Sequence, residues 1–352
     1  MKTRLVAIPE DLPEAKAHAL LEEAGAIIRS GGLVAFPTET VYGLGGNAFD
    51  AGAAKKIYAA KGRPSDNPLI VHIADAADLD RLAREVPETA RRLADAFWPG
   101  PLTLILKKQP TVPEATTGGL DTVAVRLPSL KTAQGLIRAS GGFVAAPSAN
   151  ASGRPSPTSA VHCVEDLDGK VDLIIDGGDA VLGLESTVLD LTVTPPAILR
   201  PGFVTREMLE HVLSSPVTAP SLNEVPADTA PKAPGMKYRH YAPAGALTVV
   251  TGADEAVTEY IGERLRHARK QKKPSGVICA AEHVSVYDAD AVRGYGARGD
   301  ATSFANALFA LLREMDALRI EEIYAEGIPE EGVGGALMNR LVKAAGGNVA
   351  EV

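Results

Sequence analysis

The sequence predicts a two-domain α/β protein: a large twisted mixed sheet with flanking helices, linked to a smaller parallel, doubly wound α/β domain. The length of 352 residues exceeds the usual range of a single domain. Helical and strand-like patterns alternate along both halves of the chain. Between the halves, residues 214–234 carry five prolines among small polar residues, which is typical of a stiff, extended linker. We therefore expect a first domain over 1–213, a linker over 214–243 and a second domain over 244–352.

The first half contains short strand-like runs separated by helical patterns. Helices are predicted where apolar residues recur at helical spacing, and two of them end at glycines, Gly31 and Gly62. Strands are predicted at short runs of β-branched and other apolar residues, and their number indicates one large sheet. The expected helices span 15–29, 51–61 and 88–97, and the expected strands span 33–36, 69–73, 102–107, 122–127, 143–146, 173–176 and 186–190.

The second half alternates strand and helix regularly, which is the pattern of a parallel, doubly wound sheet. No glycine-rich phosphate loop follows its first strand. Gly332, Gly334 and Gly335 precede a helix and form either an anion site or a tight loop. The expected strands span 247–251, 276–280 and 322–325, and the expected helices span 255–270, 303–318 and 334–345.

Composition indicates an ordinary globular protein of the cytoplasm. The hydrophobic fraction of 45% and the charged fraction of 23% allow a sizeable core. No apolar run reaches the ~20 residues that a bilayer span needs, and the first residues lack a secretory apolar segment. Cys163 and Cys279 are far apart and lack metal-ligand spacing, which argues against a disulfide framework and a zinc site. We expect no membrane partner.

Charge argues against non-specific nucleic-acid binding. The 36 Lys and Arg residues face 44 Asp and Glu residues, so the formal net charge is -8. The densest basic run, over residues 264–273, follows a helical pattern and precedes Pro274. Its simplest interpretation is a solvated helix end, where cations suit the helix dipole, and a weak tRNA contact is the alternative.

A rigid cationic loop is predicted over residues 61–68, with the sequence Lys-Gly-Arg-Pro-Ser-Asp-Asn-Pro. The guanidinium of Arg63 offers a planar fork for phosphate oxygens, and Lys61 supplies a point charge. Pro64 and Pro68 restrict the loop, which lowers the entropy cost of ordering it on a ligand. The alternative is a surface turn with incidental charges.

Small polar residues follow three other predicted strands. Residues 147–156 (Pro-Ser-Ala-Asn-Ala-Ser-Gly-Arg-Pro-Ser) leave the carboxyl end of a buried strand, the usual ligand position in open α/β sheets. Residues 37–45 and 183–188 contribute further hydroxyls and glycines, and Arg200 lies at a strand end. Such surroundings suit a polyanion, although Ser/Asn turns are also common without a ligand. A Ser/His/Asp triad, a P-loop and a dinucleotide fingerprint are all missing.

These motifs together resemble the YrdC-like domain, and the motif after the linker resembles that of the long, two-domain members, the threonylcarbamoyl-adenylate synthases. The resemblance covers nearly the whole chain, with the motifs in the expected order. They are Pro37-Thr-Glu-Thr-Val-Tyr-Gly-Leu44, Lys61-Gly-Arg63, Asn67-Pro-Leu69, Ala124-Val-Arg126, Pro147-Ser-Ala-Asn150, Glu185-Ser-Thr187 and Ala233-Pro-Gly-Met-Lys-Tyr-Arg-His-Tyr-Ala-Pro243.

The resemblance implies that L-threonine, bicarbonate and ATP, which brings Mg²⁺ with it, give threonylcarbamoyl-AMP and pyrophosphate. A partner complex then transfers the threonylcarbamoyl group to the tRNA adenosine beside the anticodon. The implied catalytic residues are Lys61 and Arg63, and the implied L-threonine contacts are Thr40, His72, Arg126, Ser186 and the backbone of Ala146. The implied ATP contacts are Arg63, Asn67, Thr122, Ser148, Asn150, Ser156, Arg200 and Tyr238.

Several of these residues have plainer interpretations. A lone histidine on a strand, such as His72, is commonly a satisfied half-buried residue, and Ser186 and Thr187 are also expected as ordinary strand-edge hydroxyls. Tyr238, with Met236 and Lys237, either packs on the second domain or closes over the ATP pocket as a lid. Two other functions remain as alternatives: a carbamoyl-adenylate-forming carbamoyltransferase and a non-catalytic RNA-binding module of the translation apparatus.

Overall fold

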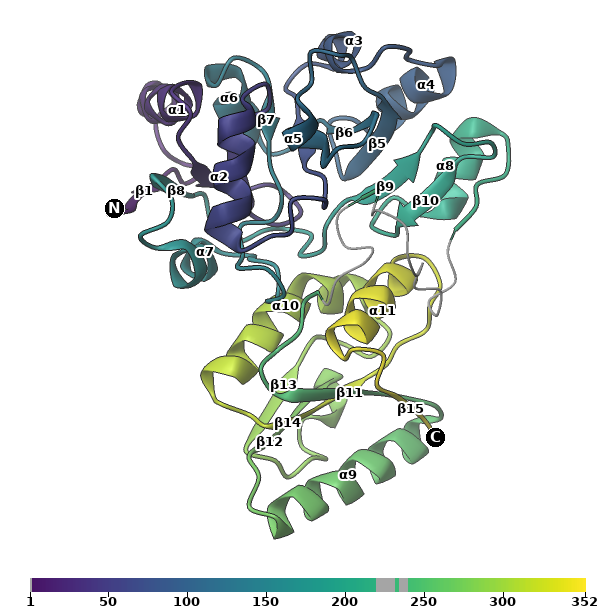
Figure 1. Ribbon diagram of the computed structural model, residues 1–352. Coiled ribbons are helices and arrows are strands. Elements are labelled where there is room, and N and C mark those ends of the chain that lie inside the picture. Colours follow the sequence, from purple (N-terminus) through teal and green to yellow (C-terminus); the bar gives the residue numbers. More distant parts are fainter. Residues whose placement is uncertain (1, 220–231, 234–239) are drawn as a thin grey trace. The chain divides into compact units, whose positions relative to one another are not determined.

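The structure is a computed structural model that describes residues 2–219, 232–233 and 240–352 (Figure 1). The described chain divides into two compact units. The first takes in residues 2–152, 156–219 and 232–233, and the second takes in 153–155 and 240–352. Among the described helices, none combines the length and apolar character that a bilayer span requires.

A ten-stranded mixed sheet organises the first unit, which confirms the predicted fold class. Its strand order is β1-β8-β2-β3-β7-β4-β6-β5-β9-β10. Parallel pairs such as β4·β6 and β5·β9 alternate with antiparallel pairs such as β5·β6. The strands are β1 (Arg4–Ala7), β2 (Val34–Phe36), β3 (Gly43–Asn47), β4 (Ile70–His72), β5 (Leu102–Lys107), β6 (Thr122–Arg126), β7 (Val144–Ala145), β8 (Leu173–Asp176), β9 (Thr187–Asp190) and β10 (Ala197–Arg200).

Helices cover this sheet, and one of them ends at the candidate site. Asp50 caps the start of α2 by accepting a hydrogen bond from the Gly52 N–H, and Gly62 ends it with φ 63°. That termination places Lys61 on the last turn. The helical segments are α1 (Glu14–Arg29), α2 (Ala51–Lys61), η1 (Ala76–Asp78), α3 (Leu79–Leu82), α4 (Glu88–Phe97), α5 (Glu114–Thr117), α6 (Lys131–Ala139), α7 (Ala160–Leu167) and α8 (Arg206–Leu213).

Side chains of β2 enter two different cores because successive residues of a strand face opposite ways. Ala35 belongs to the core that includes Ile57 of α2 and Leu93 of α4. Val34 and Phe36 belong to the core that includes residues of α1 and α6. All three β2 residues are buried, so this part of the sheet is covered on both faces.

The second unit contains a five-stranded parallel sheet in the order β13-β12-β14-β11-β15, which confirms the predicted parallel α/β domain. Asp300 caps α10 by accepting hydrogen bonds from the N–H groups of Thr302 and Ser303, so this helix begins two residues earlier than expected. The elements are β11 (Ala246–Thr251), α9 (Asp254–Lys270), β12 (Ser275–Cys279), η2 (Ala281–His283), β13 (Ala291–Gly294), α10 (Ala301–Ala317), β14 (Glu322–Glu326), α11 (Val333–Ala344) and β15 (Val349–Glu351).

The basic run at the end of α9 is partly neutralised by acidic neighbours. Arg269 pairs with Asp288, and Lys273 pairs with Glu322 at 3.0 Å. Both cations are well exposed, so these pairs contribute little to stability. Their pairing favours the interpretation of this run as a solvated helix end.

The described parts of the linker pack on the first unit. Ile198 of β10 donates its N–H to the Thr218 carbonyl at 2.8 Å, and Val217 is buried. Ala233 is fully buried against Ile70 and Ile105, among other residues of the sheet. The linker was expected to be an extended spacer, but small apolar residues such as Ala233 can fit against a sheet face.

Candidate active site

The candidate site is built along a row of residues on four neighbouring strands. His72 on β4 lies opposite Arg126 on β6, and Arg126 lies opposite Thr103 on β5. The Thr103 hydroxyl lies 2.8 Å from the Ser186 hydroxyl, immediately before β9. Residues directly opposite each other share one face of a sheet. The sheet therefore brings His72, Arg126 and Ser186 together. Ser186 was expected to be the first residue of a strand, but β9 begins one residue later.

Arg126 is the buried cation at the centre of this row, with 4% of its surface exposed. Its Nη1 donates to the Thr40 hydroxyl at 2.8 Å, and its Nη2 donates to Glu39 Oε1 at 2.6 Å. Its Nε donates to the Gly100 carbonyl at 3.3 Å. The predicted residues Thr40 and Arg126 are thus in direct contact.

Thr40 belongs to a tight polar turn between β2 and β3. The hydroxyls of Thr38 and Thr40 are 2.9 Å apart, and the Thr38 hydroxyl donates to the Val41 carbonyl at 2.6 Å. Both threonines are buried. A side-chain hydrogen bond to the backbone two or three residues on is the usual device by which threonine fixes a turn. The turn holds the Thr40 hydroxyl beside Arg126.

His72 is neutral near physiological pH. Burial and the nearby charge of Arg126 lower the pKa of its imidazole to about 3. Its Nδ1 lies 3.2 Å from the Ile70 carbonyl, and its ring meets the Phe36 ring edge-on. The residue was expected to be half-buried if it had no ligand role, but the structure buries it deeply beside Arg126.

Arg200 and Ser186 form a second buried polar group. Arg200 Nε donates to the Ser186 carbonyl at 3.0 Å, and its Nη2 donates to the Ser186 hydroxyl at 3.2 Å. Gly202 permits this close packing, because a Cβ at this position would lie 2.5 Å from the Thr187 nitrogen. Arg200, at the end of β10, was predicted on the ATP side, and Ser186 on the threonine side. The structure places these two residues in contact.

Lys61 connects the loop after α2 to the loop after β7. Its ammonium donates to the carbonyls of Ser148 and Asn150 and lies 3.3 Å from Asn150 Oδ1. The Ser148 hydroxyl donates to the same Asn150 Oδ1. The N–H of Leu44 donates to the Pro147 carbonyl at 2.8 Å, so the second loop is also fixed to the start of β3.

The 61–68 loop is braced by its own arginine. Arg63 Nε donates to the Asn67 carbonyl at 3.1 Å, and its Nη2 donates to the Pro68 carbonyl at 3.0 Å. Asn67 is buried. Because Ile70 lies opposite Ala124 in the β4·β6 pair, Thr122 at the amino end of β6 is level with the end of this loop. Thr122 is therefore at the opposite end of β6 from Arg126.

The remaining predicted residues are distributed around these groups. The Ser156 hydroxyl donates to Glu185 Oε1 at 2.6 Å, with both residues buried. The Ala146 N–H donates to the Ile70 carbonyl at 2.8 Å, so Ala146 continues the pairing of β7 with β4. Tyr238, Met236 and Lys237, which were predicted to close over the pocket, lie outside the described residues.

The site also contains buried polar residues that were not among the candidates, including Glu39, Thr103 and Glu185. Glu39 and Glu185 both lie within motifs that the sequence pointed to, but a pocket for anions gave no reason to select carboxylates. Each carboxylate accepts a hydrogen bond from a predicted site residue. The signal that would have found them is their position beside a selected hydroxyl residue, Thr40 or Ser186.

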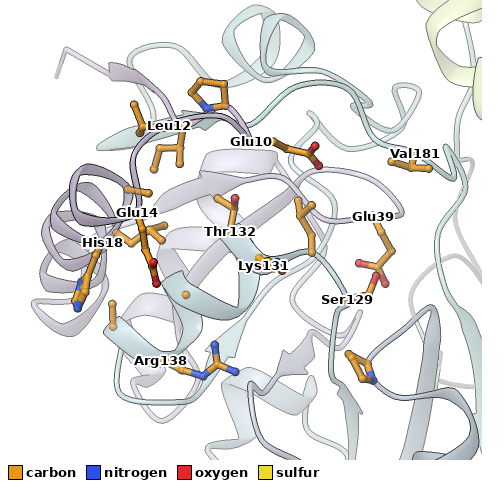
Figure 2. Close-up of a pocket in the computed structure, with 18 of the residues that line it drawn as sticks. Glu10, Leu12, Glu14, His18, Glu39, Ser129, Lys131, Thr132, Arg138 and Val181 are labelled. Atoms are coloured by element: carbon orange, nitrogen blue, oxygen red, sulfur yellow. The ribbon is translucent and has the colours of Figure 1, made fainter.

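A groove of about 1200 Å³ opens beside Glu39 (Figure 2). Its walls come from α1, α6, residues 99–101 and residues 181–182. Within the described part of the chain, no cluster of three or more His, Cys, Asp or Glu side chains could hold a metal ion.

Two family models match the chain. Residues 26–202 match the model described as "Telomere recombination", which includes YrdC and Sua5 proteins. Residues 204–346 match the model described as "Threonylcarbamoyl-AMP synthase, C-terminal domain". The matched ranges together cover most of the chain.

Curated relatives and a solved structure agree with these models. The threonylcarbamoyl-AMP synthase of Pyrococcus abyssi is 51% identical over 329 residues, 94% of this chain and 95% of the relative. That of Bacillus subtilis is 47% identical over 330 residues, 94% of each chain. The crystal structure of P. abyssi Sua5 complexed with L-threonine superposes with a TM-score of 0.94, at 48% identity, covering 99% of this chain and 100% of the other. The chain therefore belongs to the threonylcarbamoyl-AMP synthase family and has both of its domains.

Proposed function

We propose that this protein makes threonylcarbamoyl-AMP and pyrophosphate from L-threonine, bicarbonate and ATP. The observation that carries the proposal is the similarity to curated synthases along 94% of the chain. The buried polar row along β4, β6 and β5 supports it, since hydrogen-bond donors fixed in a low-dielectric site interact strongly with anions.

L-Threonine is proposed to bind at the Arg126 end of the site. The guanidinium of Arg126 suits the amino acid carboxylate, and the hydroxyls of Thr40 and Ser186 offer polar contacts close to it. His72 contributes as a neutral imidazole, which can donate from one nitrogen or accept at the other. The backbone of Ala146 completes the proposed set.

ATP is proposed to bind across the loops that Lys61 holds together. Lys61 and Arg63 are the proposed catalytic residues because their charges suit the triphosphate and the bicarbonate. The further ATP contacts are proposed to be Asn67, Thr122, Ser148, Asn150, Ser156, Arg200 and Tyr238. Mg²⁺ is proposed to arrive on the triphosphate and to neutralise part of its charge.

The reaction requires two bond-forming steps and no covalent enzyme intermediate. The neutral amine of threonine attacks the carbon of bicarbonate, and water leaves as the carbamate forms. A carbamate oxygen then attacks the α-phosphorus of ATP, and pyrophosphate leaves. Holding three substrates in one pocket supplies much of the rate, since effective molarities of well-oriented groups reach roughly 10⁵ M or more. The buried cations stabilise the negative charge that develops on oxygen in both steps.

The product is proposed to serve the threonylcarbamoyl modification of tRNA adenosine next to the anticodon, through a separate transfer complex in the cytoplasm. A mixed anhydride between a carbamate and a phosphate is activated for acyl transfer. Its consumption by a nucleophile such as an adenine amino group follows from that chemistry.

The deciding assay is pyrophosphate release from ATP with each substrate omitted in turn. We expect release to require both L-threonine and bicarbonate, with one threonylcarbamoyl-AMP formed per pyrophosphate. Release that needs carbamoyl phosphate would identify a carbamoyltransferase instead. If no substrate combination releases pyrophosphate, the proposed function is wrong.

A further inference from the structure

Glu39 forms a buried ion pair with Arg126 through one oxygen of its carboxylate, and the other oxygen makes no hydrogen bond with any described residue. Glu39 is 7% exposed, and its Oε1 accepts from Arg126 Nη2 at 2.6 Å. Among the described residues, nothing forms a hydrogen bond with its Oε2, although this atom is buried. The Leu182 N–H donates to the Glu39 carbonyl at 2.8 Å, so the backbone of Glu39 is itself held in place.

Stability alone does not explain this arrangement. A buried ion pair seldom adds net stability, because desolvation of both charges offsets their attraction. A buried oxygen without a partner adds a further cost. What the pair does supply is a fixed orientation for a long, otherwise mobile side chain. The ion pair is therefore better explained by a need to hold the Arg126 guanidinium in one orientation.

The contacts of Arg126 leave part of its guanidinium available. A guanidinium has five N–H groups. Three of them, one each on Nε, Nη1 and Nη2, donate hydrogen bonds to described residues. One N–H remains on each terminal nitrogen. Two such N–H groups can bind the two oxygens of a carboxylate, which is the strongest and most directional mode of arginine.

We propose that Glu39 is a positioning residue for the amino acid substrate: it fixes the Arg126 guanidinium so that its two remaining N–H groups meet the substrate carboxylate. This inference rests on the proposed function. Glu39 also balances the charge of Arg126 before substrate arrives. Without it, the guanidinium is free to rotate toward other acceptors, and the substrate has to reorder it on binding.

The test is Glu39→Gln in the full chain, with steady-state kinetics for each substrate. The amide keeps the shape and one acceptor oxygen but removes the charge. We expect KM for L-threonine to rise at least tenfold, while KM for ATP stays within twofold. We expect calorimetry with L-threonine alone to show the same loss of affinity. Glu39→Asp keeps the charge but is one methylene shorter. Its KM for L-threonine should lie between those of the unmodified protein and Glu39→Gln.

The matched control is Asp190→Asn, the same chemical change at another buried carboxylate of this unit. Asp190 lies at the end of β9 and accepts hydrogen bonds from Thr192 and Lys232. This variant should lose stability without changing KM for L-threonine. It therefore separates an effect on substrate binding from general damage to the unit.

The possible outcomes are distinguishable. The unmodified protein must first release pyrophosphate in response to threonine, and failure there rejects the proposed function. If Glu39→Gln melts normally and its KM for L-threonine stays within twofold, the positioning role is wrong. An equal rise in KM for threonine and ATP is a structural effect and also rejects it. If Glu39→Gln does not fold, the same criteria apply to Glu39→Asp.

Discussion

At the scale of single residues, Arg63 gives the most direct test of the ATP site. Its guanidinium braces the 61–68 loop and lies in the cationic motif Lys61-Gly-Arg63. We expect Arg63→Ala to reduce pyrophosphate release by roughly 10- to 150-fold, because a charge-assisted hydrogen bond is worth about 1.5–3 kcal/mol. The assay is turnover together with ATP binding by calorimetry.

Arg91→Ala is the control for this substitution, since Arg91 is exposed and, within the described part of the chain, pairs with exposed Asp80. Its removal should change neither turnover nor ATP affinity. Unchanged turnover and ATP affinity in a folded Arg63→Ala variant would remove Arg63 from the active site.

His72 predicts a pH dependence of stability. Its imidazole pKa is about 3 in the folded protein and about 6.5 when unfolded, so between these values the unfolded chain binds one more proton. Its contribution to stability is complete above pH ~6.5 and falls as pH decreases toward 3, by up to about 1.4 kcal/mol per unit. Denaturant melts from pH 7 to 4 should therefore show a shallower decline for His72→Asn. Parallel curves for the two proteins would contradict the lowered pKa.

The sequence singled out candidate anion-binding residues but not the residues that hold them in place. Lys61, Arg126 and Arg200 were recognisable because cations have an evident use beside phosphate and carboxylate groups. The carboxylates of Glu39 and Glu185 contact site residues from neighbouring positions, and that relation appears only in three dimensions. A residue that only positions another site residue has no sequence pattern of its own, so the sequence alone gives no reason to select it.

At the scale of elements, apolar strands and clearly periodic helices were predictable, whereas a glycine-rich strand was not. The expected helix over 51–61 is present as α2 with the same bounds. In contrast, β3 was missed because three of its five residues are glycine, which has low strand propensity. Tertiary packing explains this composition, since a Cβ on Gly45 would lie 2.8 Å from a Val144 methyl group.

Helix α1 offers a test in which packing opposes propensity. Alanine normally stabilises a helix interior by about 1 kcal/mol relative to glycine. At Gly25, however, a Cβ would lie 2.5 Å from the backbone of Ala139 at the end of α6. We expect Gly25→Ala to destabilise the first unit by about 1–3 kcal/mol, because two packed helices have to move apart.

The control is Gly262→Ala within α9, where the nearest atom to a new Cβ is the end of Arg266 at 3.6 Å. This variant should be neutral or slightly stabilising. Differential scanning calorimetry of both proteins tests the pair. A stabilised Gly25→Ala protein would show that α1 and α6 are less tightly packed than the structure indicates.

At the scale of the whole molecule, two domains could be predicted from composition, but the role of the linker could not. Proline content predicts stiffness and does not reveal which surface a chain follows. The described linker residues contact the first unit: Thr218 pairs with β10, and Lys232 pairs with Asp190 at 3.2 Å. Ala233 is buried on the sheet next to β4, which carries His72. The linker therefore belongs partly to the domain that holds the candidate site.

This packing makes the lid hypothesis testable in the full chain. Ala233 is the first residue of the motif that contains Tyr238, the linker residue proposed to contact ATP. Ala233→Asp would bury a charge against apolar residues, so we expect the linker to detach from the sheet. Detachment should lower pyrophosphate release and increase hydrolysis of the adenylate, because a closed element protects a reactive intermediate from water.

The measurements are turnover and the ratio of free AMP to intact threonylcarbamoyl-AMP. Lys232→Arg, which keeps the cation that pairs with the buried carboxylate of Asp190, should behave like the unmodified protein. If a folded Ala233→Asp protein equals the unmodified protein in turnover and in the ratio of free AMP to threonylcarbamoyl-AMP, the linker is a tether and not a lid.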